Sequence, residues 1–451
     1  MIYYNSFNIN NISTLKGLKI MQFSLFYDYH AIINSCPFLK KYDALFQAFD
    51  MIYDGPDFPA LGRRGYPRSA YLKALIYKQS ENIKYISDLV RDLESRPVLA
   101  DMCGFDTGKI PDASQFSRFL SSTNNHDVEE LLHNSGKILV ENEVASLDVL
   151  IADSKPIKAN TKHNNPKNPN RSLDKKKNIK RNPTATLSYY SYLKQPSGKK
   201  KKEFSYFWGY RTHVLISREG IPLIEVTLPN NQTDGKVAKK MLKKLVRVYG
   251  QKKGRLFIGD AGYDDRKLYN FIVKKLKAEP FIPLNKRNEH PRKVLGPHGL
   301  PLCQAKLEMK FTGICRETNR TRKSFRCPII AGRKDEKALL PSQCPVNHER
   351  FLQNKRYGCT AYIDITDDCR KQVPRESKRY KDYYKTRTEV ERYFSRLGPR
   401  EVEEVSQYKY RSIRNQMTMA HLTLSLTALA AALVLERPDK IRCYKTFADA
   451  A

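Results

Sequence analysis

Acidic residues are scarce in this sequence. Its 451 residues contain 47 Asp and Glu against 81 Lys and Arg, which gives a formal charge of +34 at pH 7. Such an excess favours a polyanion as partner, because contact with phosphates releases condensed counterions. We therefore expect the protein to bind nucleic acid. A ribosomal or other RNA-binding protein and a merely soluble surface are the alternatives that charge alone leaves open.

The sequence also lacks a secretory leader. Residues 1–26 are rich in Asn and Tyr and contain no charged start followed by an apolar run. We expect them to be a disordered extension, and Met21 is an alternative start. The run 417–435 is long enough to cross a bilayer, but it contains His421 and several Ser and Thr. A buried core helix is the favoured interpretation, so no membrane partner is expected.

Paired cysteine motifs are missing as well. The nine cysteines include no C-x2-C pair, so a zinc site is a weak alternative to buried thiols. The residues that would form such a site are Cys327, Cys344, His348 and Cys359. Without an export signal the thiols should be reduced, which predicts a cytoplasmic location.

The first part of the chain is predicted to be helical. Apolar residues recur at helical spacing through 27–145, for example at Leu72 and Leu75. We expect a compact helical domain there, with Arg63 and Arg64 on a basic loop that can contact DNA. A DNA-reading domain and a cap or dimerisation unit are equally open for this region.

Short β-branched runs then replace the helical pattern, and they predict strands at 147–153, 208–217, 221–228, 255–260 and 280–284. Helices are expected after the third strand, capped by Asp234, and after the fourth, capped by Asp264 and Asp265. This order is that of an RNase H-like mixed sheet covered by helices. The expected fold class is α+β or α/β, with the sheet in 146–284 and the last helices in 381–436.

Two segments interrupt this pattern. Residues 155–202 contain fifteen Lys or Arg and a single acidic residue, Asp174, which predicts a loop that is disordered when free and able to grip a DNA backbone. Residues 285–380 contain six of the nine cysteines and little helical periodicity, which predicts a strand-rich insertion. Residues 437–451 are expected to be a tail.

Two of the predicted strands end in a carboxylate. Asp153 closes the run LDVLIAD, and Asp260 closes RLFIGD. If these strands are neighbours, both side chains leave the same edge of the sheet. Cleavage of a phosphodiester uses two divalent cations about 3.5–4 Å apart, held by a few hard oxygen ligands. An Asp at a strand end is as often a turn or cap residue, so neither residue alone carries this assignment.

A segment near the C-terminus offers a third carboxylate. Tyr384, Arg387 and Glu391 are spaced by three and four residues, so they are expected on one face of a helix. Arg387 can pair with Glu391 or reach a phosphate. An ordinary surface ion pair is the alternative for that step.

These motifs together resemble a known family. The spacing Tyr-x2-Arg-x3-Glu is similar to the signature around the catalytic Glu in DDE transposases of bacterial and archaeal insertion sequences. LIADSKPI around Asp153 and FIGDAGYDD around Asp260 resemble that family's first and second Asp motifs, and GRRGYPRSAYLKALIY resembles the N-terminal domain of one branch. A related cut-and-paste branch carries a strand-rich insertion before the Glu. The resemblance extends from about residue 30 to about residue 435.

The resemblance implies that Asp153, Asp260 and Glu391 are catalytic and bind two Mg²⁺ or Mn²⁺ ions. It implies DNA contacts by Tyr384 and Arg387. The family's Lys, seven residues after the Glu, is Gly398 here, and the flanking Arg396 and Arg400 are the candidates to replace it.

The resemblance also implies a double-stranded DNA substrate, cleavage at terminal inverted repeats followed by strand transfer, and a homodimer across paired ends. Two alternatives remain open: an RNase H-like nuclease without strand transfer, and a transposase-derived DNA-binding protein that has lost its chemistry.

Overall fold

The computed structural model describes residues 29–58, 65–106, 108–161, 182–194, 201–285, 295–317, 320–331, 344, 359–364, 369–398 and 403–442. The chain forms two compact units. One consists of Met1–Ile282 with Arg375–Ala451, and the other of Pro283–Pro374. The second unit therefore ends before residue 380, where the predicted insertion ended. The reason lies at Arg375, whose guanidinium donates to the carbonyl of Ile282 at 2.9 Å, inside the first unit.

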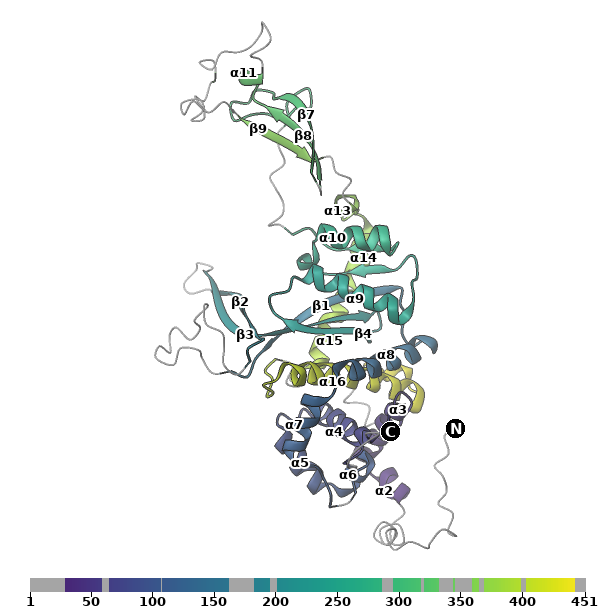
Figure 1. Cartoon of the computed structure of the whole chain (residues 1–451). Coiled ribbons are helices and arrows are strands. Elements are labelled where there is room, and N and C mark those ends of the chain that lie inside the picture. Colours follow the sequence, from purple (N-terminus) through teal and green to yellow (C-terminus); the bar gives the residue numbers. More distant parts are fainter. Residues whose placement is uncertain are drawn as a thin grey trace, which may run out of the picture. The chain divides into compact units, whose positions relative to one another are not determined.

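The N-terminal part of the first unit is helical (Figure 1). Its helices are α2 (Tyr29–Ser35), α3 (Pro37–Asp50), α4 (Arg68–Ser80), α5 (Ile86–Ser95), α6 (Pro97–Cys103), α7 (Ala113–Ser122) and α8 (Asn125–Glu141). Local signals define several ends. The Asp112 carboxylate accepts the first free N–H groups of α7 in a capping box, and α6 ends at Gly104, whose φ of +99° suits a residue without a Cβ.

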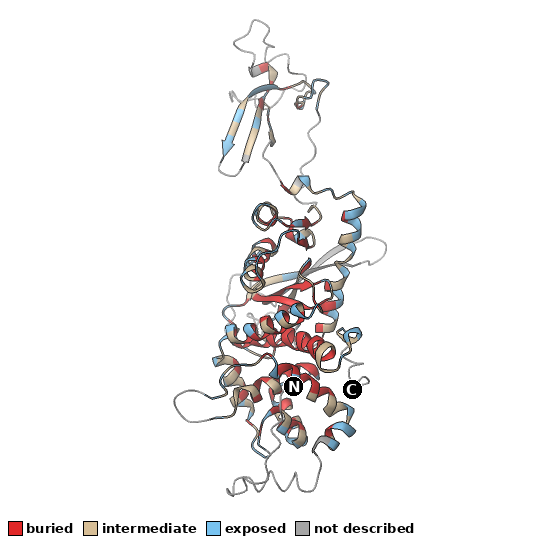
Figure 2. Ribbon diagram, turned by 90° about the vertical axis from the view of Figure 1, so that its right-hand side faces the viewer, coloured by how far each residue is buried: buried red, intermediate tan, exposed pale blue. Residues whose placement is uncertain are grey.

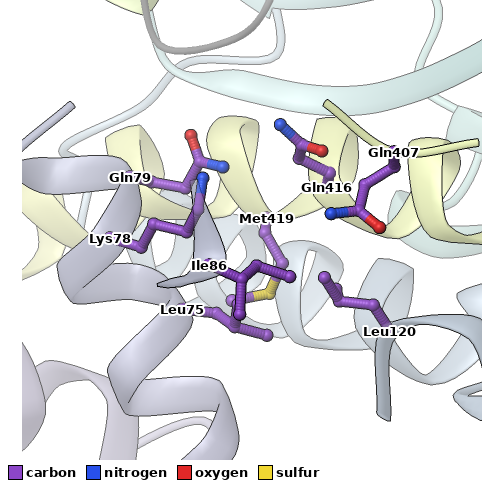
Figure 3. A pocket seen from close by; sticks show the side chains of 8 residues that line it. All are labelled: Leu75, Lys78, Gln79, Ile86, Leu120, Gln407, Gln416 and Met419. Carbon is purple, nitrogen blue, oxygen red and sulfur yellow. The ribbon is translucent and has the colours of Figure 1, made fainter. Parts of the chain in front are cut away.

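These helices share one hydrophobic core with α16 (Tyr410–Leu429), from the far end of the chain. Figure 2 shows this interior as a continuous buried layer. In Figure 3, Leu75, Ile86 and Leu120 of the helical part surround a small cavity with Met419 of α16. The predicted boundary at residue 145 is therefore not a boundary between compact units. The physical reason is that α16 is buried around its whole circumference, so it needs a second layer of helices besides the sheet.

The predicted core helix is α16 itself. The helical segment Tyr410–Val434 is long and apolar enough to cross a membrane, but 89% of its most apolar window is buried inside the protein. Its polar side chains have partners there. The Thr418 hydroxyl donates to Glu225 at 2.8 Å, and the His421 ring lies 3.0 Å from the Thr212 hydroxyl. Buried polar groups with internal partners are typical of a core helix.

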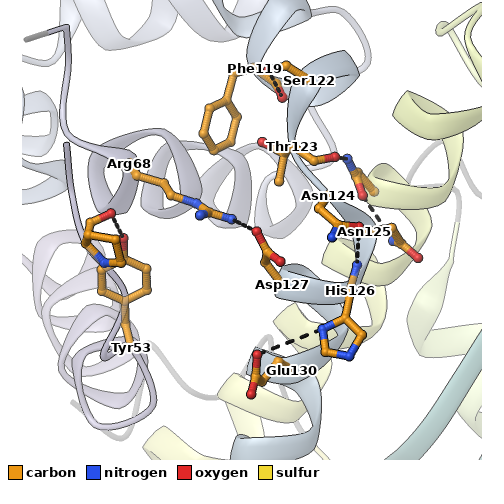
Figure 4. A network of polar contacts seen from close by, with 12 residues as sticks. Tyr53, Arg68, Phe119, Ser122, Thr123, Asn124, Asn125, His126, Asp127 and Glu130 are labelled. Atoms are coloured by element: carbon orange, nitrogen blue, oxygen red, sulfur yellow. Dashed lines mark hydrogen bonds and ion pairs between the residues drawn. The ribbon is translucent and has the colours of Figure 1, made fainter. Parts of the chain in front are cut away.

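A polar network fixes the start of α8 against α4 and α16 (Figure 4). Arg68 pairs with Asp127 at 2.6 Å. The Asn125 amide, fully inside the protein, donates to the Asn415 side chain at 3.0 Å. The Asn415 amide in turn donates to two backbone carbonyls at the end of α7, each at 2.9 Å. Because the Asn125 and Asn415 side chains are buried, each of their bonds avoids a desolvation cost of about 1–3 kcal/mol.

The rest of the first unit is built on a six-stranded mixed sheet. Its strands are β1 (Val149–Lys158), β2 (Thr186–Lys194), β3 (Lys201–Ser217), β4 (Pro222–Pro229), β5 (Leu256–Ile258) and β6 (Glu279–Phe281). β1 and β4 are antiparallel neighbours of β3, and β5 is parallel to both β1 and β6. The predicted sequence of strands and helices is therefore present, with one strand added.

The added strand corrects the prediction of a loop at 155–202. β1 continues to Lys158, and β2 pairs with the first half of the long strand β3. The run TLSYYSYLK that forms β2 is rich in Thr and Tyr, which favour strands, and Tyr189 packs beside Tyr206 across the pair. The high Lys content concealed this pattern. Residues 162–181 and 195–200 of the segment lie outside the described residues.

Helices connect and cover the parallel part of the sheet. α9 (Asp234–Tyr249) packs against β3 and β4. After β5 come η3 (Ala261–Tyr263), α10 (Arg266–Asn270) and η4 (Phe271–Lys275). Asp265 caps α10 as predicted, accepting from the Leu268 amide at 2.9 Å. Two cap predictions were wrong: Thr233 is the N-cap of α9, and Asp264 is not the cap of α10, because Asp265 holds that position.

The second unit contains a three-stranded antiparallel sheet of β7 (Lys310–Glu317), β8 (Arg320–Arg326) and β9 (Thr360–Asp364). Two short helices accompany it, α11 (Pro328–Ala331) and α13 (Cys369–Gln372). The described part of this unit is thus rich in strands. Its described core is small: Met309, Phe325 and Ala361, with a few partly buried side chains packed around them.

Candidate active site

Two neighbouring parallel strands bring Asp153 and Asp260 to the same level of the sheet. β1 and β5 pair with Ile151 opposite Ile258, and each Asp follows two residues later. In strands, a step of two returns the side chain to the same face, so both carboxylates leave that face at the same height. The Asp153 side chain is only 19% exposed. Asp260 is held locally, since its carboxylate accepts the Gly262 amide at 2.8 Å.

The third predicted carboxylate lies on α15 (Thr388–Leu397), which packs against β1. The single helix expected around it is interrupted. α14 (Lys378–Lys385) ends before a turn at Thr386 and Arg387. The Thr386 hydroxyl donates to the Tyr383 carbonyl at 2.6 Å, and such side-chain bonds compete with regular helix bonding.

Arg387 lies between the strand-end carboxylate Asp153 and the helix carboxylate Glu391. Its guanidinium lies 2.6 Å from the Glu391 carboxylate and 3.8 Å from that of Asp153. Tyr384, one turn earlier, stacks on Tyr380 with ring centroids 5.8 Å apart. Burial raises the pKa of Tyr384; Arg387 lowers it, and the nearby carboxylates of Asp260 and Asp153 raise it again. The residues of the Tyr-x2-Arg-x3-Glu spacing therefore face the strand-end carboxylates, although a turn divides their helix.

Asp234, predicted only as a helix cap, is a fourth carboxylate of this site. Its Oδ1 lies 3.3 Å from the Ser154 hydroxyl and 3.5 Å from the Arg211 guanidinium. A Cβ added at Gly262 would lie 2.9 Å from oxygens of both Asp234 and Asp260. The two carboxylates thus approach each other over a residue that has no side chain. The sequence held one weak signal for this role, since Asp234 opens the helix that follows the third core strand.

The gathering of negative charge shows in the pKa values. Burial raises the pKa of Asp153 to about 6; the Ser154 amide and Arg387 lower it, while Asp260 and Asp234 raise it further. Burial is also the main reason why the pKa of Asp234 is raised, with Arg211 opposing it. Four carboxylates here face only two guanidinium groups. The site therefore favours an added cation, which would offset both the desolvation and the mutual repulsion.

Buried polar atoms beneath the carboxylates lack partners among the described residues. They are the Tyr263 hydroxyl and both ring nitrogens of His213. The His213 ring lies 3.7 Å from Asp234, and burial, with Arg211, lowers its pKa to about 3, so the ring is neutral. The pKa of Tyr263 is raised well above its usual value by burial and then by the three Asp carboxylates. These groups can donate to bound oxygen atoms without adding charge.

The residues fit divalent cations in chemistry. Carboxylate oxygens are the ligands that Mg²⁺ prefers, and it usually keeps part of its water shell. In the described part of the chain, no three His, Cys, Asp or Glu side chains already stand in metal-binding positions. Arg387 explains this for Glu391, because it pairs with that carboxylate at 2.6 Å. Binding would require this ion pair to open.

Four other residues were predicted to contact DNA, and the structure describes one of them, Arg396. Arg396 donates to the Gly220 carbonyl at 2.9 Å, at the turn between β3 and β4. A step of five residues from Glu391 rotates it by about 140° around the helix, so it does not join the carboxylates. Arg63, Arg64 and Arg400 lie outside the described residues.

Gly398 marks the end of α15, with φ of +57°. In the transposase family that the sequence resembles, a Lys occupies this position. Here the helix terminates at Leu397, and a Lys at the same φ would be in a conformation that residues with a Cβ rarely adopt.

Comparisons with known proteins agree on one family. A family described as "Transposase DDE domain" matches residues 145–426, and one described as "Transposase domain (DUF772)" matches residues 27–122. No curated protein matches the chain.

Two solved structures are similar. The first is piggyBac transposase in a synaptic complex with hairpin DNA, at 10% identity and a TM-score of 0.36, covering 92% of this chain and 78% of that one. The second is the Mos1 transposase paired-end complex with the left transposon end, at 15% identity and a TM-score of 0.17, covering 58% and 74%. Scores this low carry no argument. The match to the DDE domain, however, spans more than half of the sequence, and the chain therefore belongs to the DDE transposase family.

Proposed function

We propose that this transposase binds the terminal inverted repeats of its own insertion sequence as a homodimer, cleaves the DNA there and joins the freed ends to target DNA. Asp153, Asp260 and Glu391 are the proposed catalytic carboxylates. One observation carries this proposal: Asp153 on β1 and Asp260 just after its neighbour β5 lie at the same level of the sheet. Arg387, which lies beside Asp153, also forms an ion pair with Glu391.

The proposed fold of the catalytic part is RNase H-like. Three antiparallel strands, β4, β3 and β1, are followed by two parallel ones, β5 and β6, with α9 between β4 and β5. This topology supports the assignment, because ligands of such sheets bind at strand ends. It also accounts for two acidic strand ends on adjacent strands.

Members of this family generally use divalent metal ions. In our proposal Asp153, Asp260 and Glu391 would hold two Mg²⁺ or Mn²⁺ ions, with Asp234 as a further oxygen donor nearby. When bound, the ions polarise the scissile phosphate and activate the attacking oxygen.

The protein's own side chains have separate tasks in this proposal. Arg387 leaves Glu391 when the site is loaded, and its guanidinium is then free for a phosphate oxygen, for which its planar fork is suited. Arg211 and Ser154 hold Asp234 in place. Below a pH of about 6, protonation of Asp153 would compete with metal binding.

The excess of basic residues supports DNA as the substrate. A formal charge of +34 attracts the phosphate backbone at long range. Which residues read the element ends stays a prediction, with Arg63 and Arg64 of the helical part as candidates. A cytoplasmic location is also proposed, from the expectation of reduced thiols.

A joining assay tests the proposal against its two rivals. The substrates are labelled duplexes carrying the sequences that flank the reading frame, with Mg²⁺ and an unlabelled target. Cleavage followed by joining is the expected result. Cleavage without joining would instead identify a nuclease, and binding without cleavage would identify a DNA-binding protein whose chemistry is lost.

Matched variants make this assay specific. Asp153→Asn and Asp260→Asn should abolish cleavage and leave binding to end duplexes intact, because removing a negative charge does not weaken attraction to phosphates. Asp148→Asn is the control, since Asp148 lies just before β1 and pairs with Lys252 at 2.5 Å, outside the site. Full cleavage by Asp153→Asn would overturn the assignment of the carboxylates.

A further inference from the structure

Four cysteines of the second unit come together from four separate segments. We propose that Cys303, Cys327, Cys344 and Cys359 bind one structural Zn²⁺ ion through their thiolates. This site is independent of the carboxylate site and of the DNA chemistry proposed above.

The register of the sheet places Cys327 beside Cys359. β8 and β9 are antiparallel, with Arg326 opposite Thr360 as their last pair. Cys327 is the next residue after β8 and Cys359 the one before β9, so they form the following pair. Their backbones are bonded, since the Cys327 amide donates to the Cys359 carbonyl at 2.8 Å. Directly opposed residues of antiparallel strands have their side chains on one face, with Cβ atoms about 4.5–5.5 Å apart.

A tight turn brings Cys303 to the same place. The Cys303 amide donates to the Leu307 carbonyl at 2.9 Å, and the Lys306 amide donates back to the Cys303 carbonyl at 3.0 Å. Both Cys303 and Cys359 pack against the small core of this unit. The turn also directs a backbone amide, that of Gln304, to the Cys359 sulfur. Amides donating to a sulfur stabilise its thiolate form, which is the form that binds a metal.

Cys344 supplies the fourth sulfur. The Cys359 thiol interacts electrostatically with those of Cys303, Cys327 and Cys344. All four are free thiols. A divalent cation would stabilise all four thiolates at once.

The unit has a reason to need such a link. Its described hydrophobic cluster contains three buried side chains, and a small core rarely stabilises a domain without a metal or disulfides. Four cysteine ligands at about 2.3 Å satisfy the tetrahedral preference of Zn²⁺. Among the described residues no three such side chains are already set around a common point, so the thiols must rotate about their single χ1 bond as the ion binds.

This set is hard to predict from sequence because each ligand comes from a different segment. The combination considered from the sequence contained His348, which lies outside the described residues, and omitted Cys303. The 303–307 turn adds Cys303 to the set.

Metal analysis of the full chain, purified without a metal-binding tag under reducing conditions, tests the proposal. We expect one zinc per chain by elemental analysis, released when the thiols are modified. Cys303→Ser and Cys359→Ser should lose the zinc. Cys315→Ser is the matched control, because Cys315 lies on β7 of the same unit outside the set, and it should keep it. Asp153→Asn should also keep it, which separates this site from the catalytic one.

Two further measurements keep the test valid if a Ser variant fails to fold. Cys303→His retains a zinc ligand and should restore binding. Replacement of zinc by Co²⁺ should give thiolate-to-cobalt charge-transfer and tetrahedral d–d bands, weakened in Cys303→His relative to the wild type. Absence of bound zinc in the folded wild type, equal zinc in wild type and Cys359→Ser, or a disulfide joining Cys327 to Cys359 in protein kept reduced would each overturn the proposal.

Discussion

Replacing Asp153 by Asn should stabilise the metal-free protein at neutral and alkaline pH, although it abolishes the proposed catalysis. The carboxylate is 19% exposed, and burial is the main cause that raises its pKa from 3.8 to about 6. A folded-state pKa above the unfolded value means that the protonated form is favoured by folding. The associated stability is complete below pH 3.8 and is lost as the pH rises through 6.

The magnitude follows from this pKa difference. Ionising Asp153 above pH 7 costs the folded state about 3 kcal/mol. Asn is neutral like the protonated Asp, and the pKa of Asp153 already includes the attraction to Arg387. The free energy of unfolding of Asp153→Asn should therefore exceed that of the wild type by about 3 kcal/mol at pH 8. At pH 4 the gain should vanish.

The assay is urea unfolding in EDTA, followed by the fluorescence of Trp208. This is the only tryptophan of the chain, and it lies buried on β3 of the same sheet. Asp148→Asn is the control. Lys252 lowers the pKa of Asp148, so this variant should be slightly less stable than the wild type at pH 8. A stability difference for Asp153→Asn that is the same at pH 4 and pH 8, or a loss of stability at pH 8, would refute the reasoning.

Three further outcomes are expected. Asp234→Asn should lower Mg²⁺ affinity by about 10- to 100-fold, the usual effect of removing a group that supports metal ligands, as measured by calorimetry; unchanged affinity would remove Asp234 from the site. Gly262→Ala should reduce cleavage by about 100-fold, since its Cβ would lie 2.9 Å from two carboxylate oxygens, whereas Gly65→Ala, with open space around it, should cleave normally. Asn415→Ala leaves two buried carbonyls and the Asn125 amide without their partner, so it should lower the free energy of unfolding by about 2–3 kcal/mol; a urea midpoint like that of the wild type would contradict this.

Local signals made the strands of the catalytic sheet predictable. β-branched runs closed by a carboxylate identified β1 and β5. The observed β5 lies inside the predicted range, and β1 begins near its predicted start but continues to Lys158. What those runs could not give was pairing. That β1 and β5 are neighbours follows from long-range contacts, and only this adjacency turns two strand-end residues, Asp153 and Asp260, into one site.

Residues whose role depends on tertiary contacts were misread for the same reason. An Asp at the first turn of a helix is favourable for local reasons alone, so Asp234 looked like a cap. Its contacts with Ser154 and Arg211 come from β1 and β3, far away in sequence. In β2, the Lys-rich composition of the surrounding segment outweighed a clear Thr and Tyr pattern. The average charge of a segment does not show whether part of it pairs with a neighbouring strand.

The net charge of the protein and the local charge of its carboxylate site have opposite signs, which suggests that DNA binding at the site depends on bound metal. The chain is strongly basic, which draws DNA to its surface. The carboxylate site is locally acidic. Beyond the effect of burial, Asp260 and Asp234 raise the pKa of Asp153, Asp260 raises that of Asp234, and all three raise that of Tyr263. Without cations, this site would repel a phosphate that the rest of the surface attracts. Metal binding would therefore do more than activate the reacting oxygens, because it would also convert this acidic site into a place where the DNA backbone can dock.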